Sequence, residues 1–120
     1  MRILFVTSNL DYGGAETQLI RMSRELVRRG HEVALFTVKA GNPRARELDG
    51  SGVLLRADGR RCGLDLSVLH RLKRFIQAFR PDIIHGYLFD GDLYSRLSAL
   101  GTGIPVLNSE RNDGYRLGIL

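Results

Sequence analysis

The stretch Asn9-Leu10-Asp11-Tyr12-Gly13-Gly14-Ala15-Glu16 decides the fold of this chain. A short apolar run, Ile3-Leu4-Phe5-Val6, precedes it, and a helical pattern from Thr17 to Arg29 follows it. A buried strand, a glycine pair and a helix start, in this order, form a site for a negatively charged group. Glycine has no Cβ, so a ligand can approach the backbone closely, and the first turn of a helix offers unpaired N–H groups.

Beyond this stretch, apolar strands alternate with amphipathic helices. The pattern predicts a helix over residues 15–29, and a second helix that Asp65 caps and that ends near Phe79. A third helix is expected to start at Asp90 or Asp92, with its leucines facing inward: Leu93, Leu97 and Leu100. Strands are expected over residues 2–8, 31–38, 53–55, 82–87 and 105–109, with a short helical turn over 44–48.

This alternation predicts an α/β fold, a Rossmann-like parallel sheet with strand order 3-2-1-4-5 and helices on both faces. The order of the strands reverses between the first and the fourth strand. Ligands in such sheets bind outside the carboxyl ends of the strands at this switch point. We therefore expect residues 9–16, the loop 87–92 and residues 110–112 to surround one cleft, with His85 ending the fourth strand beside it.

Composition limits the classes of function. The 120 residues suit one domain, and the single cysteine, Cys62, excludes an internal disulfide framework. No Cys/His metal-ligand spacing occurs, and no apolar stretch approaches membrane-spanning length. The net charge of +5 favours phosphates, acidic lipid surfaces or nucleic acid as partners. The alternative is a surface that is rich in arginine and has no polyanionic partner.

The glycine loop fails the tests for three common ligand classes. A dinucleotide site needs G-x-G-x-x-G and an acid after the second strand, but here the glycines are adjacent and Lys39 follows that strand. A P-loop needs a lysine after its last glycine, and none follows Gly14. A receiver-type phospho-acceptor needs a carboxylate at the end of the first strand, where this chain has Thr7-Ser8-Asn9. A loop that binds phosphate or sugar phosphate remains.

Residues 1–38 resemble the opening of a family 4 glycosyltransferase of the GT-B fold. Most of the likeness comes from Gly13-Gly14-Ala15-Glu16 and from the end of the following helix, Arg28-Arg29-Gly30-His31-Glu32-Val33. Pro81-Asp82-Ile83-Ile84-His85 and Gly103-Ile104-Pro105-Val106 fit the family's fourth and fifth strands. The resemblance therefore covers nearly the whole chain.

The resemblance implies that residues 1–120 are the N-terminal, acceptor-side domain of a retaining, metal-independent glycosyltransferase. Such an enzyme moves a sugar from a nucleotide-diphosphate sugar to a lipid-linked or saccharide acceptor in glycan or polysaccharide biosynthesis, and it needs no cofactor. The donor-binding C-terminal domain, with its paired glutamates, has no counterpart here, so we expect this fragment to be inactive alone. The alternative is a stand-alone sugar-phosphate or nucleotide-binding module that partners a separate donor-binding chain. A small nucleotide-binding oxidoreductase domain is a third hypothesis, against which the failed dinucleotide pattern argues.

The resemblance also suggests roles for individual residues. The donor phosphate or sugar is expected at Gly13, Gly14, Ala15 and Glu16, and the acceptor at Asn9, Tyr12, Tyr87, Asp90, Glu110 and Asn112. The catalytic residue stays unassigned, with His85 and Arg111 as candidates. Many relatives have a histidine near the position of Arg111, and a guanidinium can hold a phosphate but cannot act as a general base.

Each of these residues also has a purely structural reading. The glycine pair is then a tight strand-to-helix turn, and Glu16 a carboxylate that the helix dipole stabilises. Asp90 is then a helix cap, and His85 a packed strand residue.

Basic residues on two predicted helices suggest a further partner. Arg21, Arg24 and Arg28, together with Arg71, Lys73 and Arg74, suggest contact with an anionic membrane surface, although the charge pattern favours the alternative of two solvated helix faces. Nucleic acid is not expected, because basic and aromatic residues do not alternate as in a binding module. An exposed apolar cleft rim favours a homodimer. We expect a cytoplasmic location, peripheral at the inner face of the plasma membrane.

Overall fold

The apolar run near the amino terminus forms β1 (Arg2–Thr7), the central strand of a five-stranded sheet in the computed structural model, which describes residues 1–10, 13–59 and 65–109. The other strands are β2 (Glu32–Thr37), β3 (Leu54–Ala57), β4 (Ile83–Tyr87) and β5 (Val106–Ser109). All neighbouring strands are parallel, and their order is β3-β2-β1-β4-β5. The predicted strand order is confirmed, and the switch point lies between β1 and β4.

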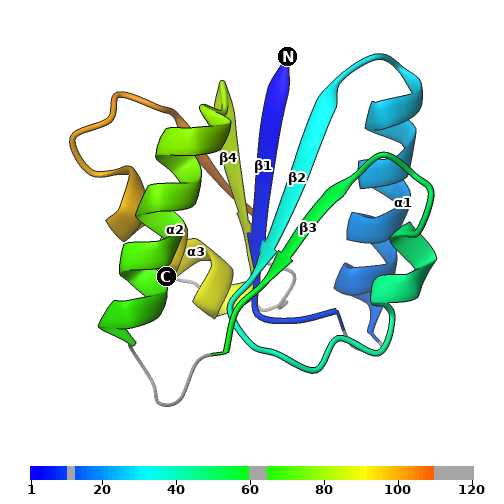
Figure 1. The fold of residues 1–120 in the computed structure, drawn as a ribbon, viewed down its shortest axis with the longest axis horizontal. Coiled ribbons are helices and arrows are strands. Elements are labelled where there is room, and N and C mark those ends of the chain that lie inside the picture. Colours follow the sequence, from blue (N-terminus) through cyan, green and yellow to red (C-terminus); the bar gives the residue numbers. More distant parts are fainter. Residues whose placement is uncertain (11–12, 60–64, 110–120) are drawn as a thin grey trace.

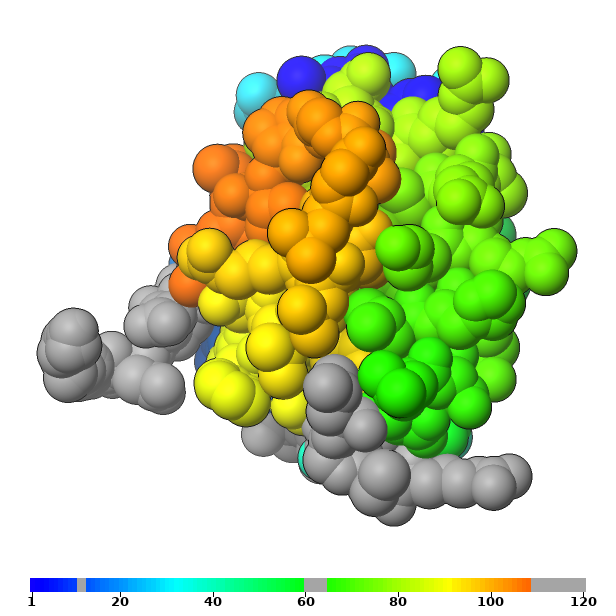
Figure 2. All heavy atoms as spheres, turned by 90° about the vertical axis from the view of Figure 1, so that its left-hand side faces the viewer, coloured from blue at the N-terminus to red at the C-terminus, as the bar shows by residue number. Residues whose placement is uncertain are grey.

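The helices cover both faces of the sheet, as predicted (Figure 1). One face carries α1 (Gly14–Arg28) and the short 3₁₀ helix η1 (Ala45–Leu48). The opposite face carries α2 (Leu66–Phe79) and α3 (Leu88–Ala99), which lie side by side in Figure 2. Successive side chains of a strand point to opposite faces, so β1 contributes Phe5 to the α1 side of the core and Leu4 and Val6 to the α2 side.

The ends of α1 and α2 follow from local sequence. Gly30 has a φ of +94° after the end of α1, and the His31 N–H donates to the Leu26 carbonyl at 3.0 Å, which is a Schellman motif. At the start of α2, the Asp65 carboxylate accepts a hydrogen bond of 2.9 Å from the Ser67 N–H. Both predicted helix-end signals are confirmed.

The prediction for the third helix is wrong in two respects. α3 starts at Leu88, directly after β4, because Leu88 adopts a left-handed conformation with a φ of 64° and turns the chain without a loop. The segment 87–92 is therefore the end of a strand and the first turn of a helix. The buried face is also different: Leu93 and Leu97 are only partly buried and Leu100 is 68% exposed. The buried residues of α3 are mostly small: Gly91, Tyr94, Ser95, Ser98 and Ala99.

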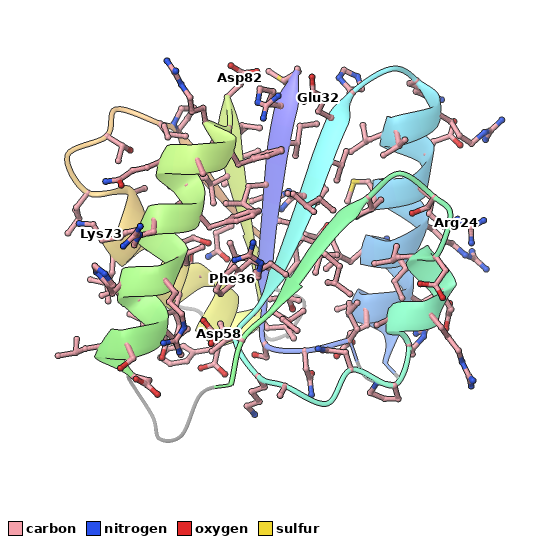
Figure 3. The ribbon with its side chains drawn as sticks, in the orientation of Figure 1. Arg24, Glu32, Phe36, Asp58, Lys73 and Asp82 are labelled. Carbon is pink, nitrogen blue, oxygen red and sulfur yellow. The ribbon has the colours of Figure 1, made fainter. Side chains whose placement is uncertain are left out.

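At the amino edge of the sheet, the Arg2 side chain links β1 to β2 and to the end of α2. Arg2 donates from Nε to the Phe79 carbonyl at 2.7 Å, its guanidinium lies 4.4 Å from the centre of the Phe79 ring, and it pairs with Glu32. Its backbone N–H donates to Asp82 at 2.7 Å. Glu32 and Asp82 lie together at this edge in Figure 3. The open, polar loops described below lie at the opposite, carboxyl edge.

Candidate functional site

The residue that leads from β1 toward the glycine loop is fixed by a distant asparagine. The Leu10 N–H donates to the Asn42 side-chain oxygen at 2.7 Å, and the Leu10 side chain is fully buried. The Asn42 amide donates in turn to the Thr37 hydroxyl at 3.1 Å, at the end of β2. Sequence reasoning missed this role, because it interpreted Gly41-Asn42-Pro43 only as a break in the chain.

The glycine pair stands at the start of α1 with open space beside it. Gly13 is the N-cap residue with φ −158° and ψ 168°, an extended conformation that any residue adopts, and neither Gly13 nor Gly14 has a positive φ. Apart from its chain neighbours and the backbone of α1, a Cβ built on Gly14 would meet no atom of the described residues within 4 Å. Within the part of the chain that the structure describes, neither backbone geometry nor packing requires glycine at position 14, so a tight turn does not explain it. The absent side chain leaves room at the helix start.

Glu16 covers the other glycine. A Cβ built on Gly13 would lie 2.5 Å from Glu16 Oε1, so the carboxylate folds back over the N-cap residue. Negative charge at a helix N-terminus is favourable, and Glu16 supplies it here. A phosphate that approached Gly13 would meet this carboxylate, and the two like charges would repel unless the side chain moved.

The first turn of α1 is held by a chain of hydrogen bonds. The Thr17 hydroxyl donates to the Gly13 carbonyl at 2.9 Å and accepts from Arg44 Nη1 at 2.6 Å. Arg44 also pairs with Glu47 of η1, with Nε and Oε2 2.8 Å apart. This network fixes the position of the glycine loop relative to η1.

The other side of the switch point is formed by the first turn of α3. The Ser8 hydroxyl, just after β1, donates to Asp90 Oδ2 at 3.0 Å. Asp90 is not the N-cap of α3, which is Tyr87, but lies in its first turn. The neighbouring Phe89 is 78% exposed, the most exposed large apolar side chain among the described residues. Sequence reasoning missed Ser8 and Phe89; the only signal was their position just beyond two central strands.

His85 and Tyr87 are packed on the α1 side of the sheet. Tyr87 is 3% exposed, and its ring centre lies 4.6 Å from that of His85 and 6.0 Å from that of Phe5. His85 is inside β4, two residues before its end, which corrects the predicted terminal position. Burial lowers the pKa of His85 below its ordinary value, so the ring is neutral near pH 7. The buried Tyr87 ring offers little surface to a ligand in this conformation.

Some of the predicted site residues follow the carboxyl ends of the neighbouring strands β1 and β4: Asn9, Gly13, Gly14, Ala15, Glu16 and Asp90. Tyr12, Glu110, Arg111 and Asn112 lie outside the described residues. Within the described ranges, no three His, Cys, Asp or Glu side chains are grouped so that they could hold a metal ion. None of the helices described here is long and apolar enough to cross a membrane.

A family model described as Glycosyltransferase Family 4 matches residues 12–114. The match includes the glycine loop, all three α-helices and β2 to β5. A comparison of the sequence with curated proteins finds no significant match.

Solved structures of low sequence identity share the fold. MurG from Acinetobacter baumannii superimposes with a TM-score of 0.76 at 16% identity, over 97% of this chain and 36% of MurG. Anabaena HepE in complex with UDP gives 0.68 at 18% identity, over 90% of this chain and 29% of HepE. A deacetylase of the teicoplanin biosynthetic pathway gives 0.70 at 17% identity, over 100% of this chain and 69% of the deacetylase. This chain spans about a third of the two longer proteins, and the fold alone does not distinguish sugar transfer from deacetylation.

Proposed function

Because the chain belongs to glycosyltransferase family 4, we propose that it forms the acceptor-side half of a retaining glycosyltransferase. The proposed reaction moves a sugar from a nucleotide-diphosphate sugar to a lipid-linked or saccharide acceptor, and we assign most of the donor site to a second domain. The observation that carries the proposal is the open space at Gly14, at the switch point of the sheet.

We assign the departing phosphate of the donor to the start of α1. The N–H groups of Gly14 and Ala15 belong to the first turn, where no helical carbonyl can accept from them. Negative charge develops on the phosphate as the sugar leaves, and fixed N–H donors together with the positive end of the helix dipole stabilise that charge. The absence of a side chain at Gly14 allows the phosphate to come close to these donors.

Glu16 suits a sugar hydroxyl better than a phosphate. Its carboxylate already lies over Gly13, and a second negative charge there is unfavourable. A carboxylate accepts hydrogen bonds from neutral hydroxyl groups without this repulsion. We therefore propose that the transferred sugar contacts Glu16 while its phosphate lies toward Gly14.

The acceptor is assigned to the α3 side of the switch point. Asp90 is oriented by Ser8, and Asn9 follows on the same chain segment. The exposed Phe89 ring offers an apolar face for a saccharide or lipid acceptor beside the polar Asp90 carboxylate. Because Tyr87 is buried, we favour Phe89 over Tyr87 as the aromatic contact.

The basic residues that suggest a membrane contact fall into two separate sets. Arg24 projects from α1 and Lys73 from α2, on opposite sides of the sheet (Figure 3). A flat anionic surface can therefore contact one set at a time. We therefore propose that peripheral association with a membrane uses the α1 set or the α2 set and not both.

The test is a Gly14→Val substitution in the full-length enzyme, assayed for release of nucleoside diphosphate from a panel of nucleotide sugars. We expect kcat/KM to fall at least 100-fold, about 2.7 kcal/mol of transition-state stabilisation, because the valine side chain would fill the phosphate position. Ser67→Val in the first turn of α2 is the matched control and should keep full activity. Unchanged turnover by Gly14→Val, with the circular dichroism spectrum also unchanged, would refute the proposal.

A further inference from the structure

Half of the residues that line a groove between α1 and η1 are arginines. Its volume is about 450 Å³, and its walls carry four arginines and two glutamates, namely Arg21, Arg24, Arg28, Arg44, Glu25 and Glu47. The groove starts at Thr17, in the first turn of α1, and follows the helix toward Arg28. Arg21 and Arg24 lie beyond that first turn, to which the donor phosphate is assigned, so a ligand that they bind is distinct from that phosphate.

Each of the two carboxylates in the groove already pairs with arginine. Glu25 accepts from Arg28 at 2.5 Å and from Arg29 at 3.0 Å, and Glu47 accepts from Arg44 at 2.8 Å. The hydrogen bonds from these arginines lower the pKa of both carboxyl groups, so the pairs remain ionised at neutral pH. The two carboxylates are thus bonded to Arg28, Arg29 and Arg44, and the arginines around the groove outnumber them.

Arg21 and Arg24 form none of these side-chain ion pairs. Arg21 has no hydrogen-bond or ion-pair partner among the described residues, and Arg24 donates only to the backbone carbonyl of Glu47, at 3.2 Å. That contact turns the Arg24 guanidinium toward η1 and into the groove. The two residues are three positions apart on the helix, a rise of about 4.5 Å, so both guanidinium groups can reach one ligand.

The arrangement fits a phosphate group better than a carboxylate. Each guanidinium presents two parallel N–H donors, and one carboxylate satisfies one such fork. A phosphate or pyrophosphate has enough oxygens for two forks and enough charge for two cations. We propose that the α1–η1 groove is a second anion site, which binds the phosphate or pyrophosphate group of a ligand through Arg21 and Arg24.

The experiment titrates the full-length protein with inorganic pyrophosphate in a calorimeter. The Arg21→Gln/Arg24→Gln variant should bind at least tenfold more weakly, because it loses both charge-assisted contacts. Lys73→Gln/Arg74→Gln on α2 is the matched control: it removes the same charge from the opposite side of the sheet and should bind within twofold of the unsubstituted protein. The affinity should fall as salt is added.

A second arm identifies the source of the phosphate. Vesicles of phosphatidylcholine with and without phosphatidylglycerol are sedimented with the same proteins. Binding that needs phosphatidylglycerol, is lost in the Arg21/Arg24 variant and is displaced by pyrophosphate supports the site with a lipid headgroup as its ligand. Pyrophosphate binding without vesicle binding supports it with a soluble phosphorylated ligand. Absence of binding to both probes, or an equal loss in the two double variants, would overturn the proposal.

Discussion

Gly91 of α3 packs its Cα directly against the backbone of Val6 in β1, since a Cβ built on Gly91 would lie 2.2 Å from the Val6 carbonyl oxygen. The same contact continues to β4, where a Cβ on Gly86 would lie 2.8 Å from the Asp92 Cα. Backbone therefore meets backbone where β1, β4 and α3 converge. This close approach holds the first turn of α3, with Phe89 and Asp90, at the switch point.

Gly91→Ala should destabilise the protein by about 3 kcal/mol, because the added methyl group must displace β1 or α3. The measurement is the free energy of unfolding in urea. Gly14→Ala is the matched control, since it also places alanine in a helix but has open space around the new Cβ. It should change stability by less than about 1 kcal/mol. Equal stability of the two variants would show that α3 can move away from β1 at little cost.

The errors in the predicted third helix have this same origin. Apolar periodicity finds helices that bury large side chains, and it correctly located α1 and α2. The buried face of α3 instead consists mostly of small residues, and Gly91 packs against the backbone of β1. The leucines of α3 therefore predicted the wrong buried face. The start of α3 was also predicted wrongly. An acidic residue is a common cap signal, whereas nothing in the sequence shows that Leu88 adopts the left-handed conformation.

Asp65→Ala should cost about 1 kcal/mol of stability, since α2 would lose the side chain that accepts from the Ser67 N–H. Ser67→Ala keeps that backbone donor and should stay within about 0.5 kcal/mol of the unsubstituted protein. The urea midpoints of the two variants give the comparison. Destabilisation of the same size in both would mean that the Asp65 cap contributes nothing of its own.

Only part of the candidate site could be predicted from the sequence. The glycine pair was recognisable because residue type, strand and helix start are adjacent in the chain. Asn42 was not, because its contact with Leu10 spans 32 positions and depends on how the β2–η1 connection folds back. The burial of Tyr87 was not predicted either, since a strand end does not show which face its last side chain takes.

Asn42→Ala should destabilise the protein by about 1–3 kcal/mol and expose the Leu10 amide, which loses its acceptor. Amide hydrogen exchange at Leu10 is the direct readout, and protection should fall. Asn42→Asp retains an oxygen for the Leu10 N–H and removes the donors to Thr37 and Lys39. It should preserve Leu10 protection even where overall stability drops. Loss of Leu10 amide protection in Asn42→Asp would show that the hydrogen bond from Asn42 to Thr37, and not the one from Leu10 to Asn42, holds this segment in place.

Protonation of His85 should destabilise the protein in mild acid. Its pKa is lowered in the folded state by burial, so the unfolded chain binds the proton more readily. Stability is then full above the ordinary pKa of 6.5 and falls as the pH drops below it, by at most about 1.4 kcal/mol per pH unit. Urea unfolding between pH 5 and 7 should show this slope.

His85→Phe, which keeps a ring beside Phe5 and Tyr87, should remove this pH dependence, whereas His70→Gln on the exposed face of α2 should leave it in place. A slope that persists in His85→Phe would assign the acid sensitivity to another group.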